Sequence, residues 1–119
     1  MTIDLPALAN TEFCYLTTTG RVTGKPHTIE IWFALQAPVL YMLAGSGNNA
    51  DWVKNAQHQP EVSVRINEVE LAGAARVVTA TEEDALARRL ILEKYEGHSE
   101  DDLTEWGRTS LPVAIDLQV

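Results

Sequence analysis

The chain has 119 residues, of which 45% are hydrophobic and 22% charged, so its length and composition fit a single folded domain over residues 1–119. Seventeen acidic against nine basic residues give a formal net charge of −8, which argues against a protein that binds nucleic acids or anionic membranes. The one cysteine, Cys14, excludes an internal disulfide and a multi-thiolate metal site, and we expect it to pack in the core.

Neither a signal peptide nor a membrane span is predicted. Residues 1–10 lack a basic stretch followed by an apolar one. The longest apolar stretch, residues 31–45, is interrupted by Gln36 and Pro38 and is shorter than the ~20 residues that cross a bilayer. These features predict a cytoplasmic protein without membrane insertion.

Alternating apolar residues predict three strands in the first part of the chain, over Glu12–Thr19, His27–Leu35 and Val39–Ala44. In the second of these, one face is expected to carry Ile29, Ile31, Phe33 and Leu35, and the other Thr28, Glu30, Trp32 and Ala34. Glycines and a proline predict a tight turn over Gly20–Pro26, between the first two strands.

A loop of small residues, Gly45–Asn49, precedes a predicted helix over Ala50–His58, with Asn49 as its N-cap. The loop and Ala50 fit the spacing G-x-G-x-x-A of dinucleotide-binding proteins, but the helix is too short and the strands too amphipathic for that fold. Small residues before a helix still favour binding of an anionic ligand, and the alternative is an ordinary strand-to-helix turn.

The second half of the chain predicts three more strands and two helices. The strands are Glu61–Asn67, Val69–Ala80 and Pro112–Gln118. One helix runs over Thr81–Tyr95 with a capping box of Thr81 and Asp84, and a short one begins at Ser99 with Asp102 and ends near Gly107. Six half-buried strands favour antiparallel pairing and a barrel, so we predict a mainly β (α+β) domain with two or three short peripheral helices.

The turn Gly20–Pro26 and the residue after it concentrate basic side chains. Arg21, Lys25 and His27 are suited to charge-assisted hydrogen bonds with a phosphate, and the alternative is a solvated hairpin tip. Trp32 and Trp52 are candidates either to flank a planar ligand or to pack, whereas Trp106 is expected to pack. The spacing of the histidines predicts no metal site.

Taken in order, these segments resemble the deazaflavin-dependent nitroreductase family, within the split β-barrel flavin and deazaflavin reductases. The resemblance covers Phe13 to Leu117 and rests on the stretches TTGRVTGKP and DWVKNAQHQPEVSV and a final W-x-R-x-x-L-P. It implies a six-stranded antiparallel split β-barrel of the FMN-binding, pyridoxamine-phosphate-oxidase-like type.

The resemblance also implies an activity. Members of the family bind coenzyme F-420, whose tail carries a phosphate and several carboxylates, and pass a hydride to a small electron-poor acceptor such as a quinone, nitro compound or enone. The alternatives are an FMN-binding flavoprotein reductase and a non-catalytic module that binds a flavin or deazaflavin. A homodimer is a further expectation, through the strand faces that bear Trp32 or Tyr41.

Carried over by position, the resemblance implies three groups of coenzyme-binding residues and one catalytic residue. The phosphate would be held by Gly20, Arg21, Thr23, Gly24, Lys25 and His27; the ring would be lined by Ala44, Gly45, Ser46, Gly47 and Asn48; Trp52 and Asn55 would complete the wall. Tyr95 would hydrogen-bond or protonate the acceptor. Val22 stands where the family often has a basic residue, Gly47 replaces a frequent lysine, and Glu30 replaces a frequent proline.

Overall fold

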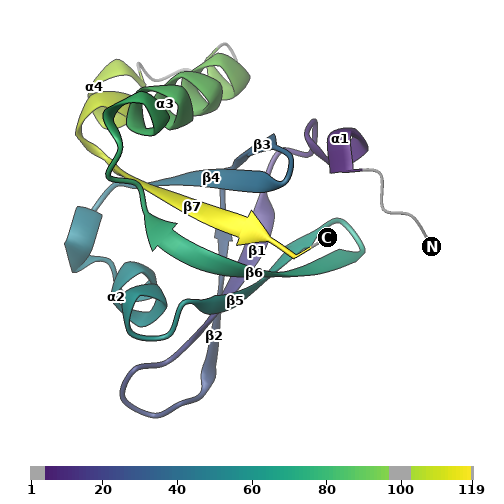
Figure 1. Cartoon of the computed structure of the whole chain (residues 1–119), viewed down its shortest axis with the longest axis vertical. Coiled ribbons are helices and arrows are strands. Elements are labelled where there is room, and N and C mark those ends of the chain that lie inside the picture. The colour runs from purple at the N-terminus through teal and green to yellow at the C-terminus, as the bar shows by residue number, and fades with distance from the viewer. Residues whose placement is uncertain (1–4, 97–102, 119) are drawn as a thin grey trace.

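The computed structural model describes residues 5–96 and 103–118, with side chains from residue 7 onward, and its main feature is one curled antiparallel sheet (Figure 1). The strands are β1 (Cys14–Thr19), β2 (Pro26–Ile31), β3 (Ala34–Gln36), β4 (Val39–Ala44), β5 (Glu61–Ile66), β6 (Val69–Val77) and β7 (Leu111–Leu117). They lie in the order β2-β1-β5-β6-β7-β4-β3. The predicted mainly β fold of the split-barrel type is therefore confirmed.

The sheet has seven strands where six were predicted, because the segment His27–Leu35 is divided. Its first part, β2, pairs with β1, whereas β3 pairs with β4 at the other edge of the sheet. The two residues between them, Trp32 and Phe33, leave the ladder, since Phe33 enters the core and Trp32 stacks on Tyr95. The predicted faces are nevertheless confirmed, with Ile29, Ile31, Phe33 and Leu35 all against the central core.

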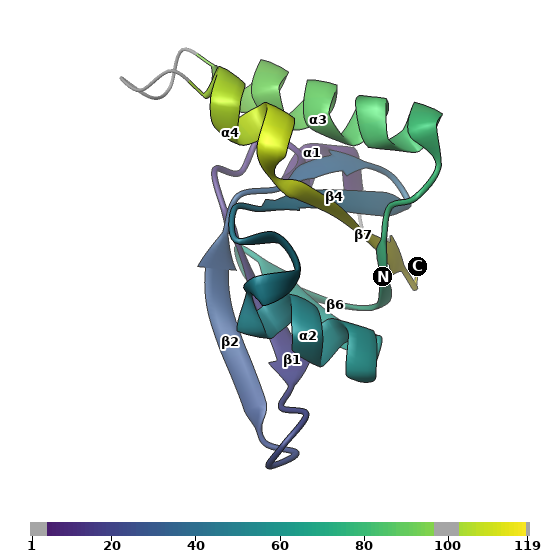
Figure 2. The ribbon, with the colours of Figure 1, turned by 90° about the vertical axis from the view of Figure 1, so that its left-hand side faces the viewer.

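The core lies inside the curl of the sheet. Residues such as Leu16, Val64 and Ile115 are fully buried there, and the helix α2 (Asp51–His58) adds Val53 and Ala56. Cys14 is also fully buried, as predicted, and this burial raises the pKa of its thiol to about 12. The helix α2 lies beside β1 and β6 and follows the short 3₁₀ helix η1 (Gly47–Asn49) (Figure 2).

A second layer covers the outer face of β4 and β7. It consists of the helices α3 (Thr81–Tyr95) and α4 (Thr104–Thr109), while α1 (Leu5–Leu8) precedes β1 (Figures 1 and 2). Beneath α3, Tyr41 packs with Ala87, and Trp32 packs with Tyr95. The predicted dimer surface at Tyr41 was therefore wrong, because Tyr41 is 3% exposed beneath α3. Trp32 is partly exposed, so a dimer through its face stays a prediction.

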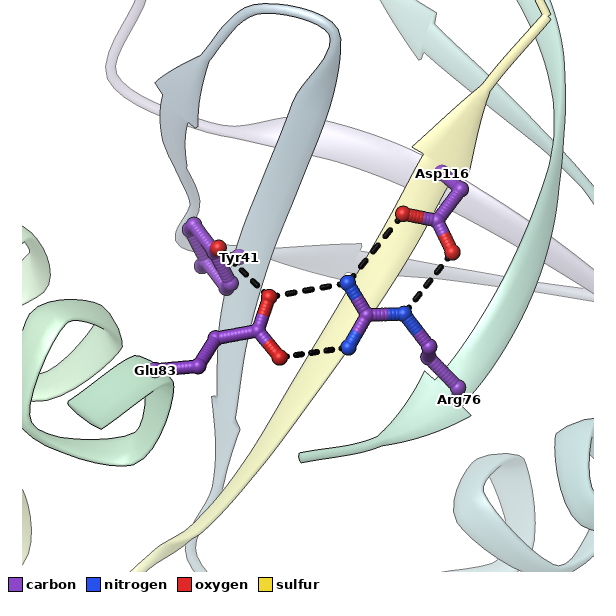
Figure 3. A network of polar contacts seen from close by, with 4 residues as sticks. All are labelled: Tyr41, Arg76, Glu83 and Asp116. Atoms are coloured by element: carbon purple, nitrogen blue, oxygen red, sulfur yellow. Dashed lines mark hydrogen bonds and ion pairs between the residues drawn. The ribbon is translucent and has the colours of Figure 1, made fainter. Parts of the chain in front are cut away.

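A polar network ties the start of α3 to the sheet (Figure 3). Arg76 on β6 lies between two carboxylates, with its Nη2 2.8 Å from Oε2 of Glu83 and its Nε 2.8 Å from Oδ2 of Asp116 on β7. The buried Tyr41 donates its hydroxyl to Glu83 at 2.8 Å. Hydrogen bonds from Arg76 lower the pKa of Glu83 to about 2, so this carboxylate stays ionised across the neutral range.

The helices form where predicted, but their predicted caps were wrong. The N-cap of α2 is Ala50 rather than Asn49, and that of α3 is Ala80, without a side-chain cap hydrogen bond in either case. Asp84 binds Arg88 at 2.6 Å instead of closing a capping box. The predicted start of the last helix, at 99–102, lies outside the described residues, and α4 ends at Thr109, two residues beyond the predicted end. Within the described segments, no helix is long and apolar enough to cross a membrane.

Candidate functional site

A pocket of about 480 Å³ lies between the β1–β2 turn and α2. Six of the predicted coenzyme-binding residues line it: Gly20, Arg21, Thr23, His27, Trp52 and Asn55. The volume lies within the range of small-molecule sites, roughly 300–1,000 Å³. The structure thus brings the basic turn and the W-x-x-N segment, which are about 30 residues apart in sequence, to one place.

The β1–β2 turn is held by its own backbone. Gly20 donates its N–H to the carbonyl of Lys25 at 2.8 Å, and Gly24 donates to the carbonyl of Gly20 at 2.9 Å. Gly24 has a positive φ of 74°, which favours glycine, and a Cβ on Gly20 would lie 2.7 Å from Nε2 of His27. These two glycine N–H groups are therefore already used, and they do not fit the predicted role of phosphate donors.

Arg21 is the cation of the pocket, and a buried amide fixes its position. Oδ1 of Asn55 accepts hydrogen bonds from Nη1 of Arg21 at 2.8 Å and from its backbone N–H at 3.2 Å. Asn55 is only 4% exposed, and its Nδ2 donates to Oγ1 of the buried Thr18 at 3.5 Å. Asn55 is thus a positioning residue for Arg21 rather than a plain part of the wall.

The sequence prediction missed an acidic neighbour of this arginine. Asp51 begins α2, and its Oδ1 lies 3.2 Å from Nη2 of Arg21. A usable signal existed, because Asp51 precedes Asn55 by four residues and so faces the same way on the predicted helix. Thr18, Val22, Thr28 and Ile29 also line the pocket without having been predicted.

The wall of the pocket opposite the turn includes the half-buried Trp52, which also packs against the core. Ile29 on β2 adds a second apolar surface. One aromatic and one branched aliphatic side chain beside a fixed guanidinium can bind a ligand that has both an apolar part and an anionic group.

The remaining predicted binding residues do not line this pocket. Gly24 and Lys25 are exposed at the tip of the turn, and the side chain of Ala44 is buried in the core. Gly45 lies against Trp106, Gly47 has a positive φ of 57°, and Asn48 accepts a hydrogen bond from Gln57. Ser46 is exposed in the same loop. The predicted ring-lining loop therefore lies outside the pocket that contains Arg21.

A second pocket, of about 280 Å³, lies next to the first along β2. It is lined by Phe13, Glu30, Ile31, Trp32, Leu43 and Trp106. Ile29 lines the first pocket and Ile31 the second, and residues two apart in a strand are separated by roughly 7 Å. The two pockets are therefore neighbours: the first contains a cation, and three of the six residues that line the second are aromatic.

Two of these aromatic side chains are also structural. Trp32 stacks on Tyr95 with ring centroids 4.2 Å apart, and Trp106 meets Trp32 edge-on at 5.8 Å. The predicted packing role of Trp106 is therefore confirmed. Its contact with the second pocket was not predicted.

Tyr95 does not fit the predicted catalytic role. The residue is 2% exposed, and its hydroxyl donates to the carbonyl of Glu12 and accepts the N–H of Phe33 at 3.0 Å. Burial raises the pKa of this hydroxyl to about 12. Tyr95 lines neither of the two pockets along β2, and it connects α3 to the start of β1 and to the β2–β3 junction. Its position is that of a structural residue.

Comparison with solved structures identifies the same fold in proteins of low sequence identity. An F420-H2 dependent reductase (FDR-A) is 23% identical, with a TM-score of 0.70 over 90% of this chain and 94% of the other. A candidate pyridoxamine 5′-phosphate oxidase from Listeria innocua is 16% identical, with a TM-score of 0.71 over 97% and 90%. A protein described as a domain-swapped dimer is 24% identical, with a TM-score of 0.71 over 90% and 80%. A search of curated proteins finds no match.

The family comparison covers almost the whole chain. Residues 6–118 match the family described as "F420H(2)-dependent quinone reductase". The matched range includes both pockets and the turn that carries Arg21. This match confirms the resemblance to deazaflavin-dependent reductases, and the structural likeness to FDR-A agrees with it. The chain therefore belongs to the F420H(2)-dependent quinone reductase family and is an oxidoreductase.

Proposed function

We propose that this protein transfers a hydride from reduced coenzyme F-420 to a small electron-poor acceptor, such as a quinone, nitro compound or enone. The observation that carries the proposal is the guanidinium of Arg21, fixed by Asn55 beside an apolar wall in a pocket of about 480 Å³. The family match supports the coenzyme, so FMN is not needed to explain the site.

The donors in the pocket fit an anionic tail. The side chain of Arg21 is 33% exposed, which leaves part of its guanidinium accessible from the pocket. In the described part of the chain, the backbone N–H groups of Val22 and Thr23 have no protein acceptor, and both residues line the pocket. A guanidinium next to backbone N–H groups is a common way to bind a phosphate.

The apolar surfaces fit a planar ring system. Trp52 and Ile29 would contact it in the first pocket, and Trp32 and Trp106 offer aromatic surface in the second. When bound, the reduced coenzyme supplies the hydride. The chain would bind the tail, orient the ring and exclude water from its apolar side.

Glu30 bears on the choice of acceptor. This residue lines the second pocket, and its Oε1 accepts a hydrogen bond from the hydroxyl of Tyr15 at 3.2 Å. A carboxylate at this position repels an anionic acceptor and tolerates a neutral one. An uncharged quinone therefore fits the proposal better than an acceptor with a carboxylate.

The first test is the replacement Arg21→Ala, with Lys54→Ala as the matched control. Lys54 is an exposed residue of α2 outside the pocket, so both variants lose one positive charge. Loss of a charge-assisted hydrogen bond to phosphate should weaken coenzyme binding by about 1.5–3 kcal/mol, or roughly 10- to 150-fold. Quenching of tryptophan fluorescence on titration with F-420, and separately with FMN, measures the dissociation constants.

Three outcomes would change the proposal. Equal dissociation constants for the Arg21→Ala and Lys54→Ala variants would remove Arg21 from the binding site. Preferential binding of FMN would make the protein a flavoprotein reductase, and binding of F-420 without reduction of any quinone or nitro compound would indicate a non-catalytic module.

A homodimer, as in the similar protein described as a domain-swapped dimer, stays a prediction that the molar mass in solution tests.

A further inference from the structure

The guanidinium of Arg21 is already bound to a carboxylate of its own chain. Nη2 of Arg21 lies 3.2 Å from Oδ1 of Asp51, while Nη1 of Arg21 donates to Asn55 and lies 3.5 Å from the carbonyl of Asp51. All three residues line the first pocket. An incoming phosphate and the Asp51 carboxylate therefore compete for the same donors.

The two partners of Arg21 differ in how easily a ligand could replace them. Asn55 is 4% exposed, is tied to Thr18 and also binds the backbone of Arg21, so it cannot leave without disturbing α2 and the turn. The side chain of Asp51 is 86% exposed, and Arg21 is the only partner that its carboxylate has in the described part of the chain. An exposed ion pair of this kind contributes little stability and is readily exchanged.

We propose that Asp51 is an exchangeable internal ligand of Arg21, which lowers the affinity of the pocket for an anionic ligand and speeds the release of that ligand. The inference rests on the proposed function, in which Arg21 binds the phosphate of the coenzyme. To bind, the phosphate displaces the carboxylate from Nη2. The displaced carboxylate stays nearby as a like charge and takes the donor again when the phosphate leaves.

This arrangement suits a coenzyme that binds and dissociates in every catalytic cycle. A reductase that uses a dissociable coenzyme needs the oxidised form to leave before the next reduced molecule binds. Product release limits the turnover of many enzymes. Asp51 re-forms its ion pair with Arg21 when the pocket is empty. It therefore favours exchange of the coenzyme over tight binding of it.

The test is Asp51→Asn, which removes the charge and keeps the shape of the side chain. We expect the variant to bind F-420 about 3- to 10-fold more tightly than the wild type, mainly through slower dissociation. Inorganic pyrophosphate serves as a second probe that needs no ring pocket. The control is Glu61→Gln, an exposed carboxylate at the start of β5 outside the pocket, which changes the net charge equally.

A double-mutant cycle separates competition from a general effect on α2. In the background Arg21→Ala, the replacement Asp51→Asn should give a clearly smaller gain for either probe, because the contested donor is absent and only the like-charge repulsion of Asp51 remains. A second variant, Asp51→Glu, retains the charge and should bind both probes within about twofold of the wild type. Circular dichroism of each variant checks that α2 is intact.

The outcomes distinguish this inference from the proposed function. If Asp51→Asn gains affinity for pyrophosphate while no variant binds F-420, the anion site stands and the proposed function fails. If the wild type binds F-420 and Asp51→Asn binds both probes no more tightly, the inference is wrong and the function stands. If no variant binds either probe, or if the gain is equally large without Arg21, the inference is overturned.

Discussion

The role assigned to Tyr95 changes once the hydrogen-bond partners of its hydroxyl are known. The family resemblance implied that Tyr95 hydrogen-bonds or protonates the acceptor. In the structure, this hydroxyl binds the backbone of Glu12 and Phe33 and is not accessible from either pocket along β2. No pattern in the sequence could indicate these partners, because they are 83 and 62 residues away.

The replacement Tyr95→Phe tests this structural assignment. It removes the acceptor for the Phe33 N–H and the donor to the Glu12 carbonyl, both next to a buried ring. Leaving buried groups unpaired should lower the free energy of unfolding by about 1–3 kcal/mol. Denaturant unfolding measures this loss, and fluorescence titration should show an unchanged dissociation constant for F-420.

The opposite pattern would restore the catalytic role of Tyr95. A variant with normal stability and normal coenzyme binding, but with a much lower rate of quinone reduction, would show that the hydroxyl acts on the acceptor. The matched control is Tyr41→Phe, which removes a hydroxyl that binds Glu83 beneath α3 and lines neither of the two pockets.

At the scale of elements, the attachment of α3 to the sheet depends on the first turn of the helix. Glu83 binds Arg76, and through it Asp116, so that α3, β6 and β7 share one guanidinium (Figure 3). The pKa of Glu83 is lowered from 4.5 to about 2. A lowered pKa in the folded state contributes stability that is present above pH 4.5 and is lost as the pH falls towards 2.

The replacement Glu83→Gln should therefore flatten the pH dependence of stability. Between pH 5 and 2 the wild type loses the contribution of this carboxylate, whereas the variant has none to lose. The free energy of unfolding, measured by urea titration at several pH values, checks the prediction. Glu82→Gln, one residue earlier and exposed, is the control, and an equal slope in Glu83→Gln and wild type would contradict the assigned role.

The elements also show what the sequence could and could not predict. The alternation of apolar residues in His27–Leu35 predicts which side chains face the core, because successive side chains of a strand point to opposite faces. It does not show that the segment changes partners at Trp32, since β2 and β3 keep the same inward face on opposite edges of the sheet. The loop Gly45–Asn49 has the composition of an anion site, yet its fold against Trp106 and Gln57 depends on distant residues.

The residues that line the pockets were predicted only in part, because some of them come together only in the folded chain. Arg21, Trp52 and Asn55 were found because their motifs carry them, but the contact that fixes Arg21 joins segments 34 residues apart. Asp51 could have been found from its helical spacing to Asn55. The aromatic walls of the second pocket could not, because Phe13, Leu43 and Trp106 meet only in the folded chain.

The whole molecule has a field that opposes the ligand it is proposed to bind. Its net charge is −8, and the tail of F-420 is also anionic, so the two repel each other at long range while Arg21 attracts the tail locally. Raising the ionic strength from 10 to 150 mM shortens the Debye length from about 30 to about 8 Å. We expect the association rate constant to rise about two- to threefold over this range.

Stopped-flow fluorescence with F-420 measures this rate constant directly. The dissociation rate constant should also rise, because salt weakens the contact between Arg21 and the phosphate. An association rate constant that falls with salt would show that the local field of the pocket, rather than the net charge, controls the encounter.

The place of β7 in the sheet has a consequence for how the protein is made. This strand lies between β6 and β4, and it hydrogen-bonds to both. During synthesis β4 and β6 leave the ribosome well before Leu111–Leu117, and until then each has an edge without its partner. Unpaired edges bind other strands readily, so the nascent chain is exposed to association with other chains during this interval. A translational pause shortly before β7 should therefore reduce the yield of soluble protein more than one placed earlier than β4.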